Sequence, residues 1–260
     1  MTNPDIIVFT DLDGTLLDHR DYSWQAADPA LQMMRDKGWP VILASSKTAA
    51  EIAPLRAEVG FDHCPAIVEN GAGILPAGAS PDNSADAYTR LRAALDSLPD
   101  QLRQKFKGFG DMSDAEVAQI TGLPLPQATL ARQRAFSDPG LFDGTEAEED
   151  AFVAALSDLG LHARRGGRFL TLSWGGTKAD RMDDILKTYG HPTSIALGDA
   201  PNDVEMLEKA DHGVIITNPD GKPLPQLPGE SAGCIRRSTK PGPAGWNAEV
   251  IALLSNLTTI

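Results

Sequence analysis

The chain has 260 residues, of which 42% are hydrophobic and 23% are charged, and its formal net charge is -13 at pH 7. These values are typical of a globular protein with one large domain or a core and a smaller second domain. The acidic balance argues against general binding to nucleic acids or anionic membranes but allows an anionic substrate, because local cations or a metal ion can reverse the field inside a cleft.

The first predicted element is a buried strand over residues 6–9, which are all apolar. Asp11 and Asp13 follow at its carboxyl end, where α/β sheets bind their ligands, and the chain then turns at Gly14. Side chains two residues apart on a strand share one face, so the two carboxylates repel unless a cation separates them or one is protonated. An acidic turn without a function is the alternative, since Asp and Gly favour turns.

Helices and strands then alternate. Residues 29–37 predict a helix that ends at Gly38, and residues 39–44 predict a second buried strand. Thr48 and Glu51 form a capping-box pattern for the next helix. Residues 65–70 predict a third strand that is closed by a glycine-rich turn. This order predicts a parallel, doubly wound sheet.

The composition changes between residues 77 and 86, which are rich in Gly, Ala, Ser, Pro and Asp, as linkers are. Residues 87–172 predict a helix, a short strand, helices, a strand, a helix and two strands, with a hairpin turn at 164–168. Strands and helices kept apart in this way indicate an inserted α+β unit. We therefore expect a core domain over residues 1–82, an inserted domain over 83–174 and the rest of the core over 175–260.

The α/β alternation resumes with a helix over 178–187, a strand over 194–198 and an acidic turn over 199–203. A strand over 213–216 follows, then a segment rich in Pro and Gly, and a final helix from about Trp246. The predicted fold class is α/β, with a doubly wound parallel-sheet (Rossmann-like) core and an inserted α+β domain.

A second pair of carboxylates, Asp199 and Asp203, follows this later strand as Asp11 and Asp13 follow the first. Three or four carboxylates at one edge of a sheet require a hard cation, and Mg²⁺ fits oxygen ligands in a partly hydrated octahedral site. The alternative is that Asp199 to Asp203 only opens a helix, where Asp and Pro are favoured.

Ser45 and Lys178 are candidates for binding an anionic group. Ser45 lies between a strand and the first turn of a helix, where free amides can bind a phosphoryl oxygen. Lys178 opens a helix against the macrodipole, which suggests that it faces an anion, whereas Lys47 fits a solvated surface charge. With carboxylates as nucleophile and as acid/base, and with a lysine and a metal to offset charge, such a site suits phosphoryl transfer.

In this order, the segment 11–17, Ser45, Lys178 and the segment 198–203 resemble the four motifs of haloacid-dehalogenase-superfamily phosphatases. The resemblance implies that the inserted unit is that superfamily's α/β cap, which closes over the substrate and supplies specificity. It also implies Asp11 as the nucleophile and Asp13 as the acid/base. Ser45 and Lys178 would hold the phosphoryl group. The implied Mg²⁺ ligands are Asp11, the main-chain carbonyl of Asp13, Asp199 and, directly or through water, Asp203.

A narrower likeness covers most of the chain. The segments 45–48, 68–71, 136–139, 165–169, 177–178 and 242–247 resemble mannosyl-3-phosphoglycerate phosphatases. This family removes phosphate from a glycosylated 3-phosphoglycerate and leaves a glycosylglycerate, a compatible solute. The resemblance implies a magnesium-dependent phosphatase that converts mannosyl-3-phosphoglycerate to mannosylglycerate through an aspartyl phosphate.

The acidic chain needs local cations for the carboxylate of such a substrate, and the hairpin arginines Arg164, Arg165 and Arg168 are candidates. A basic hairpin tip in water is the alternative, above all for Arg164. Asn70 either faces the cleft or stabilises its turn, and Trp246 and Asn247 are expected to start the last helix. The expected substrate-binding residues are Ser45, Ser46, Asn70, Arg165 and Arg168.

Other functions stay open at this point. The substrate could be another sugar phosphate, such as glucosyl-3-phosphoglycerate, sucrose phosphate or a hexose phosphate, and a phosphomutase would use the same aspartyl phosphate. A phospho-accepting regulatory module is shorter and needs no second carboxylate two positions after the nucleophile. Two distant cysteines and an N-terminal run without a basic leader suggest a cytoplasmic protein with reduced thiols. The expected partner is a small-molecule substrate, with no nucleic acid and no membrane.

Overall fold

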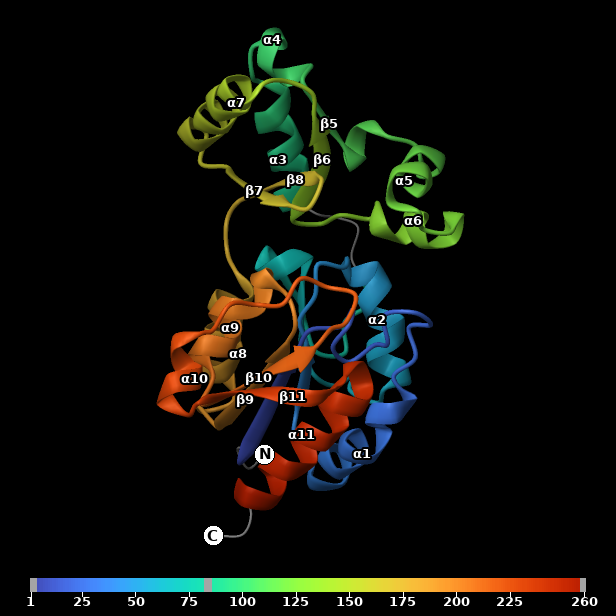
Figure 1. The fold of residues 1–260 in the computed structure, drawn as a ribbon. Coiled ribbons are helices and arrows are strands. Elements are labelled where there is room, and N and C mark those ends of the chain that lie inside the picture. Colours follow the sequence, from blue (N-terminus) through green and yellow to red (C-terminus); the bar gives the residue numbers. More distant parts are fainter. Residues whose placement is uncertain (1–3, 82–85, 258–260) are drawn as a thin grey trace. The chain divides into compact units, whose positions relative to one another are not determined.

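The computed structural model of the chain describes residues 4–81 and 86–257, which fold into two units (Figure 1). The first unit consists of residues 1–45, 55–79 and 177–260, and the second of residues 46–54 and 80–176. The boundary predicted between residues 82 and 83 lies outside the described residues. At the other end of the insertion the chain returns to the first unit at Thr177, where the sequence places the boundary at residue 175.

The first unit is built on a five-stranded sheet in the order β11-β10-β9-β1-β2, in which all neighbours are parallel. Its central strand β1 (Ile6–Thr10) is entirely buried, as its run of apolar residues predicts. At the end of β1, Thr10 is in register with Leu43 of β2 (Val41–Leu43) and with Leu197 of β9 (Thr193–Gly198). These strands therefore deliver the residues that follow them to the same edge of the sheet.

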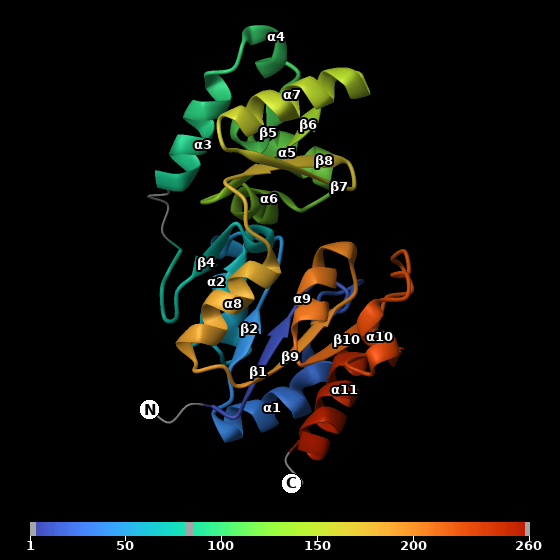
Figure 2. The ribbon, with the colours of Figure 1, turned by 90° about the vertical axis from the view of Figure 1, so that its left-hand side faces the viewer.

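Helices cover both faces of this sheet. Figures 1 and 2 place α8 (Lys178–Thr188) and α9 (Val204–Lys209) on one face, and α1 (Asp28–Lys37) and α11 (Gly242–Leu257) on the other. Helix α2 (Ala49–Glu58) has the predicted capping box, since the main-chain N of Thr48 donates to Oε2 of Glu51 at 2.8 Å. A short helix, α10 (Pro228–Ala232), precedes the last strand. The doubly wound α/β core is confirmed.

The second unit is an α+β domain with a four-stranded antiparallel sheet in the order β5-β6-β8-β7. Its apolar centre includes Leu91, Leu95, Phe106, Phe152 and Leu170. The strands and helices are α3 (Asp86–Asp96), α4 (Asp100–Arg103), β5 (Phe106–Gly108), α5 (Asp114–Thr121), α6 (Leu125–Ala131), β6 (Ser137–Phe142), α7 (Glu146–Asp158), β7 (His162–Gly166) and β8 (Phe169–Ser173).

Two details of the predicted third strand differ from the structure. Strand β3 (Ala66–Val68) is linked to the parallel sheet by an isolated bridge between Ala44 and Ile67 and is not one of its five strands. It pairs instead with the antiparallel strand β4 (Gly73–Leu75), which the sequence analysis did not predict. A single-turn helix, η2 (Glu69–Gly71), connects the two strands.

The C-terminal region was also predicted incompletely. Strand β10 (His212–Thr217) is followed by β11 (Ile235–Pro241), an edge strand within the segment that was described from the sequence only as rich in Pro and Gly. Only Ile235 and Ser238 of β11 are buried, so the strand has no apolar alternation to reveal it. Helix α11 begins at Gly242, four residues before the predicted start at Trp246, because Pro243 is tolerated in the first turn of a helix.

Within residues 4–81 and 86–257, no helix is long and apolar enough to span a membrane.

Candidate active site

Three buried carboxylates meet at the edge of the sheet where β1 and β9 end. Asp11 follows β1, Asp199 follows β9, and Asp203 ends the single-turn helix η4 (Pro201–Asp203). Each of the three offers an oxygen that lies within 4.8 Å of the oxygens of the others. The structure therefore brings together side chains that are as far apart as 192 positions in the sequence.

Lys178 joins this cluster from the first residue of α8. Its side chain is 1% exposed, and its Nζ lies 2.5 Å from Oδ1 of Asp11 and 2.7 Å from Oδ1 of Asp203. A lysine at the positive end of a helix dipole is favourable only against anionic partners, and here it has two. The side chain faces the anionic environment that its place in the sequence suggests.

The start of α8 is held in place by the turn after β3. The main-chain N of Thr177 donates to Oδ2 of Asp180 at 2.9 Å, and a Cβ on Gly71 would lie 2.1 Å from the carbonyl carbon of Thr177. Glycine is required at position 71 because a Cβ would clash with the main chain of Thr177 and because a φ of +90° disfavours residues that carry a Cβ. Nε of Arg181 donates to the carbonyl of Gly71 at 3.0 Å and completes the contact.

The electrostatics of the cluster favour an additional positive charge. Burial and, to a smaller extent, the carboxylate of Asp203 raise the pKa of Asp11 to about 8, although Lys178 opposes this rise. Although burial alone lowers the pKa of Lys178, the carboxylates of Asp11 and Asp203 outweigh it and hold that pKa above its usual value. Without a further cation the carboxylates repel one another, so a proton or a metal ion stabilises the group.

The donor set fits a hard divalent cation. Three carboxylates and one ammonium leave a net charge of minus two when all are ionised, and carboxylate oxygens are the ligands that Mg²⁺ prefers. Asp203 is fixed by main-chain donors, since its Oδ2 accepts from the N of Asp199 and the N of Ala200, both at 3.1 Å.

Asp199 is held at both of its oxygens. Oδ1 accepts from Oγ1 of Thr15 at 2.8 Å, and Oδ2 accepts from Nδ2 of Asn218 at 2.7 Å. Burial raises the pKa of Asp199, while the hydrogen bonds from Asn218 and Thr15 favour its ionised form. Neither Thr15 nor Asn218 is among the site residues predicted from the sequence. In the sequence, Asn218 is marked by its position directly after β10, a strand whose carboxyl end lies at the same edge of the sheet as those of β1 and β9.

The other predicted site residues of the first unit lie in the loops after β1, β2 and β3. Asp13 is half-buried in the turn in which the N of Gly14 donates to the carbonyl of Leu17 at 3.0 Å. Ser45 is buried, and its carbonyl accepts from the N of Asn70 at 2.9 Å.

Asn70 faces the acidic turn after β9, because its Oδ1 accepts from Nδ2 of Asn202 at 3.0 Å. Its φ of +59° is in the left-handed region, which Asn tolerates better than most residues. Ser46, which belongs to the second unit, is exposed between β2 and α2.

The two predicted cap arginines lie on the exposed hairpin of β7 and β8 in the second unit. Arg165 forms an ion pair with Glu149 of α7, in which Nε lies 3.0 Å from Oε1. Arg168 is exposed, and its guanidinium carbon lies 5.3 Å from the centroid of the Phe169 ring. Arg165 is thus engaged within its own unit, while Arg168 lies over an aromatic neighbour.

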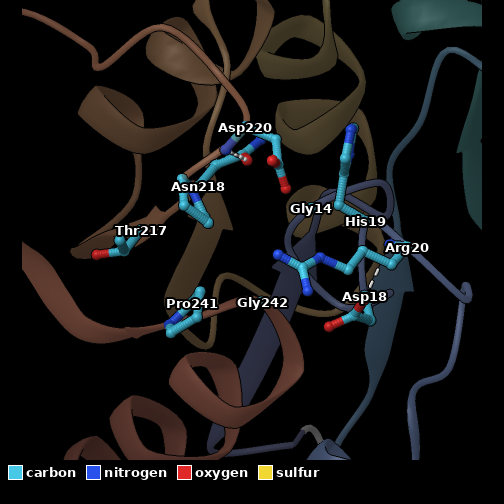
Figure 3. A pocket seen from close by; sticks show the side chains of 10 residues that line it. Gly14, Asp18, His19, Arg20, Thr217, Asn218, Asp220, Pro241 and Gly242 are labelled. Atoms are coloured by element: carbon cyan, nitrogen blue, oxygen red, sulfur yellow. Dashed lines mark hydrogen bonds between the residues drawn. The ribbon is translucent and has the colours of Figure 1, made fainter.

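A cavity of about 260 Å³ lies in the first unit (Figure 3). Three segments form its walls: the loop after β1, the loop after β10 and the start of α11. Asn218, which bonds Asp199, lies on one of these walls. The lining residues are Gly14, Asp18, His19, Arg20, Thr217, Asn218, Pro219, Asp220, Pro241 and Gly242.

Comparison with known proteins agrees with this architecture. The family model described as haloacid dehalogenase-like hydrolase matches residues 8–90 and 167–222. A glucosyl-3-phosphoglycerate/mannosyl-3-phosphoglycerate phosphatase of Persephonella marina is 33% identical in an alignment 273 residues long that covers 97% of this chain and 98% of that protein.

Two solved structures show the same fold at low sequence identity. A Thermoplasma acidophilum protein has a TM-score of 0.65 at 17% identity and covers 95% of this chain and 97% of its own. The sucrose-phosphatase of Synechocystis sp. PCC6803, solved with sucrose and phosphate, has a TM-score of 0.60 at 17% identity and covers 98% of this chain and 99% of its own.

Proposed function

Because the chain belongs to the haloacid dehalogenase-like hydrolase family and is a phosphoric monoester hydrolase, we propose that it is a magnesium-dependent phosphatase of mannosyl-3-phosphoglycerate. The observation that carries the proposal is the likeness to the Persephonella marina phosphatase, which extends over 97% of the chain and therefore includes the second unit. In this proposal the product is mannosylglycerate, and the second unit acts as the cap that selects the substrate.

Asp11 is the proposed nucleophile. One of its carboxylate oxygens attacks phosphorus, the new bond between Asp11 and phosphorus forms, and the ester bond between phosphorus and the glycerate oxygen breaks. Asp13 gives its proton to the leaving alkoxide. Asp13 then takes a proton from water, whose oxygen attacks the aspartyl phosphate, so that inorganic phosphate leaves and the Asp11 carboxylate is restored.

A metal ion would be held by Asp11, the main-chain carbonyl of Asp13, Asp199 and Asp203. When bound, Mg²⁺ offsets negative charge on the transferring phosphoryl group. Lys178 and Ser45 orient the same group, and Lys178 also offsets the repulsion between Asp11 and Asp203 by pairing with both.

Substrate recognition beyond the phosphate is assigned to residues of both units. Asn70, which is bonded to Asn202, and Ser46 are proposed to contact the substrate in the loops after β3 and β2. Arg165 and Arg168 are proposed to bind the glycerate carboxylate, which a guanidinium can hold through two parallel hydrogen bonds. We also place the protein in the cytoplasm, where free thiols such as those of Cys64 and Cys234 stay reduced.

The main rival substrate is glucosyl-3-phosphoglycerate, which the name of the Persephonella marina relative includes. The experiment that tests the proposal is release of inorganic phosphate from a panel with and without Mg²⁺. The panel holds mannosyl-3-phosphoglycerate, glucosyl-3-phosphoglycerate, 3-phosphoglycerate, mannose 6-phosphate and sucrose 6-phosphate.

We expect kcat/KM for mannosyl-3-phosphoglycerate to exceed that for the non-glycerate substrates by at least about tenfold, and to be lost on chelation, since recognition of the carboxylate adds transition-state binding. A preference for the glucosyl compound would replace mannose by glucose in the proposal. Similar slow rates on every compound would contradict the assignment of a glycosyl-phosphoglycerate substrate.

A further inference from the structure

Asn218 takes no part in the roles proposed so far, yet it contacts the carboxylate cluster directly. It follows β10, and its Nδ2 lies 2.7 Å from Oδ2 of Asp199. The other oxygen of that carboxylate accepts from Oγ1 of Thr15 at 2.8 Å. Side chains from two different loops therefore hold both oxygens of Asp199, which fixes the plane of the carboxylate as well as its position.

The amide of Asn218 is itself fixed by the turn in which it lies. Its Oδ1 accepts from the main-chain N of Asp220 at 3.0 Å and from that of Gly221 at 3.1 Å. Because the oxygen end of the amide is engaged by these two donors, the amino end must face Asp199. The turn thus sets the direction in which the donor points.

The loop after β1 closes over this contact. A Cβ on Gly14 would lie 2.9 Å from Nδ2 of Asn218 and 3.1 Å from Oδ2 of Asp199. The φ of Gly14 is +83°, so glycine is required both by the conformation and by the space. The contact between Asn218 and Asp199 is therefore enclosed by backbone on the side of β1.

We propose that Asn218 is a positioning residue for the metal site, which it serves by holding Asp199 in the orientation in which this carboxylate shares the cluster with Asp11 and Asp203. The inference rests on the metal site of the proposed function. Hydrogen bonds that orient metal-ligating side chains commonly change metal affinity by about tenfold to a hundredfold. Without the amide donor, Asp199 gains rotational freedom, and the ion must order it on binding.

The variant Asn218→Ser should remove the hydrogen bond to Asp199 and keep the turn that follows β10. A serine hydroxyl can still accept from the main chain two residues further on, but it is too short to reach Asp199. Asn218 borders the cavity of about 260 Å³, so a shorter side chain enlarges a space that already exists and leaves no new void in the packed core (Figure 3). Gln226→Ser is the matched control, because it removes an exposed amide from the same unit.

The measurement is Mn²⁺ binding to the full-length, metal-free protein, followed by the electron paramagnetic resonance signal of the free ion. We expect Asn218→Ser to raise the Mn²⁺ dissociation constant about tenfold to a hundredfold, while Gln226→Ser leaves it unchanged. The loss of phosphatase activity in Asn218→Ser should then shrink as the Mg²⁺ concentration is raised, which damage to substrate binding would not produce.

Thr15→Val provides a second route should Asn218→Ser fold poorly. It removes the donor on the other oxygen of Asp199 with little change of shape, and we expect it to weaken Mn²⁺ binding as well. An unchanged Mn²⁺ dissociation constant in folded Asn218→Ser overturns the inference and leaves Asn218 a residue of the turn. A wild-type protein that binds no Mn²⁺ overturns the metal site itself, and the inference with it.

Discussion

Nζ of Lys178 lies 2.5 Å from Oδ1 of Asp11, in an ion pair that joins the first residue of α8 to the residue after β1. The same Nζ is 2.7 Å from Oδ1 of Asp203. One ammonium thus balances two carboxylates that are almost inaccessible to water. This arrangement keeps Asp11 close to a positive charge, while burial and its acidic neighbours favour its protonated form.

Asp11→Asn should abolish turnover and preserve the fold. The amide is isosteric with the carboxylate but is no nucleophile, and Lys178 keeps its partner Asp203. We expect kcat/KM for phosphate release to fall by at least about a thousandfold, with an unchanged far-ultraviolet circular dichroism spectrum. Asp62→Asn, at an exposed position of the same unit, is the control and should be fully active. Retained activity in Asp11→Asn would remove Asp11 as the nucleophile.

The metal-free protein should lose stability as the pH rises towards 8. Burial raises the pKa of Asp11 from 3.8 to about 8, so between these values the folded protein binds a proton that the unfolded chain has released. The free energy of unfolding therefore decreases with increasing pH across this window. Urea unfolding in the presence of a chelator, at pH 5, 6, 7 and 8, measures the slope.

Asp11→Asn supplies the reference for this slope, because its amide does not titrate. As the pH rises, the free energy of unfolding of the wild type should fall relative to that of Asp11→Asn. A difference that stays constant from pH 5 to pH 8 would contradict the raised pKa of Asp11.

The sequence predicts the parts of this site that follow apolar strands. The strands that precede Asp11 and Asp199 contain continuous apolar runs over residues 6–9 and 195–197, so their ends, and the carboxylates after them, can be located without a structure. Helices α5 and α7 of the inserted α+β unit are predictable from their capping boxes, Ser113 with Glu116 and Thr145 with Glu148.

The sequence does not show which loops contact one another. Thr15 and Asn218 are single polar residues in turns, and no periodicity marks them as partners of Asp199. The sequence does not reveal strand β11 either, because an edge strand with few buried residues has the composition of a loop. In both cases the missing information is which segments are neighbours in space.

Arg168→Ala should impair recognition of a glycerate carboxylate more than catalysis at phosphorus. We expect KM for mannosyl-3-phosphoglycerate to rise about tenfold and KM for an aryl phosphate, which has no carboxylate, to stay within about twofold. Arg165→Ala is the informative comparison, because Arg165 is bound to Glu149 and its removal should have the smaller effect. Equal increases for both substrates in Arg168→Ala would exclude Arg168 from substrate recognition.

Arg56 should be important for the stability of the first unit. The residue is 2% exposed, and its guanidinium donates to the carbonyls of Cys64 at 2.8 Å, of Pro76 at 2.9 Å and of Ala79 at 2.9 Å. Ala79 is the last residue of the first unit before the chain enters the second. One buried cation therefore ties this exit segment to α2 and to the loop before β3.

Arg56→Leu fills most of the same volume but leaves these carbonyls without their donor. We expect the free energy of unfolding to fall by about 2–4 kcal/mol in urea denaturation, since a buried acceptor without a partner costs about 1–3 kcal/mol. Arg90→Leu, at an exposed position, should change it by less than about 0.5 kcal/mol. If Arg56→Leu were as stable as wild type, water would have to satisfy the carbonyls of Cys64, Pro76 and Ala79, and Arg56 would not hold the exit segment.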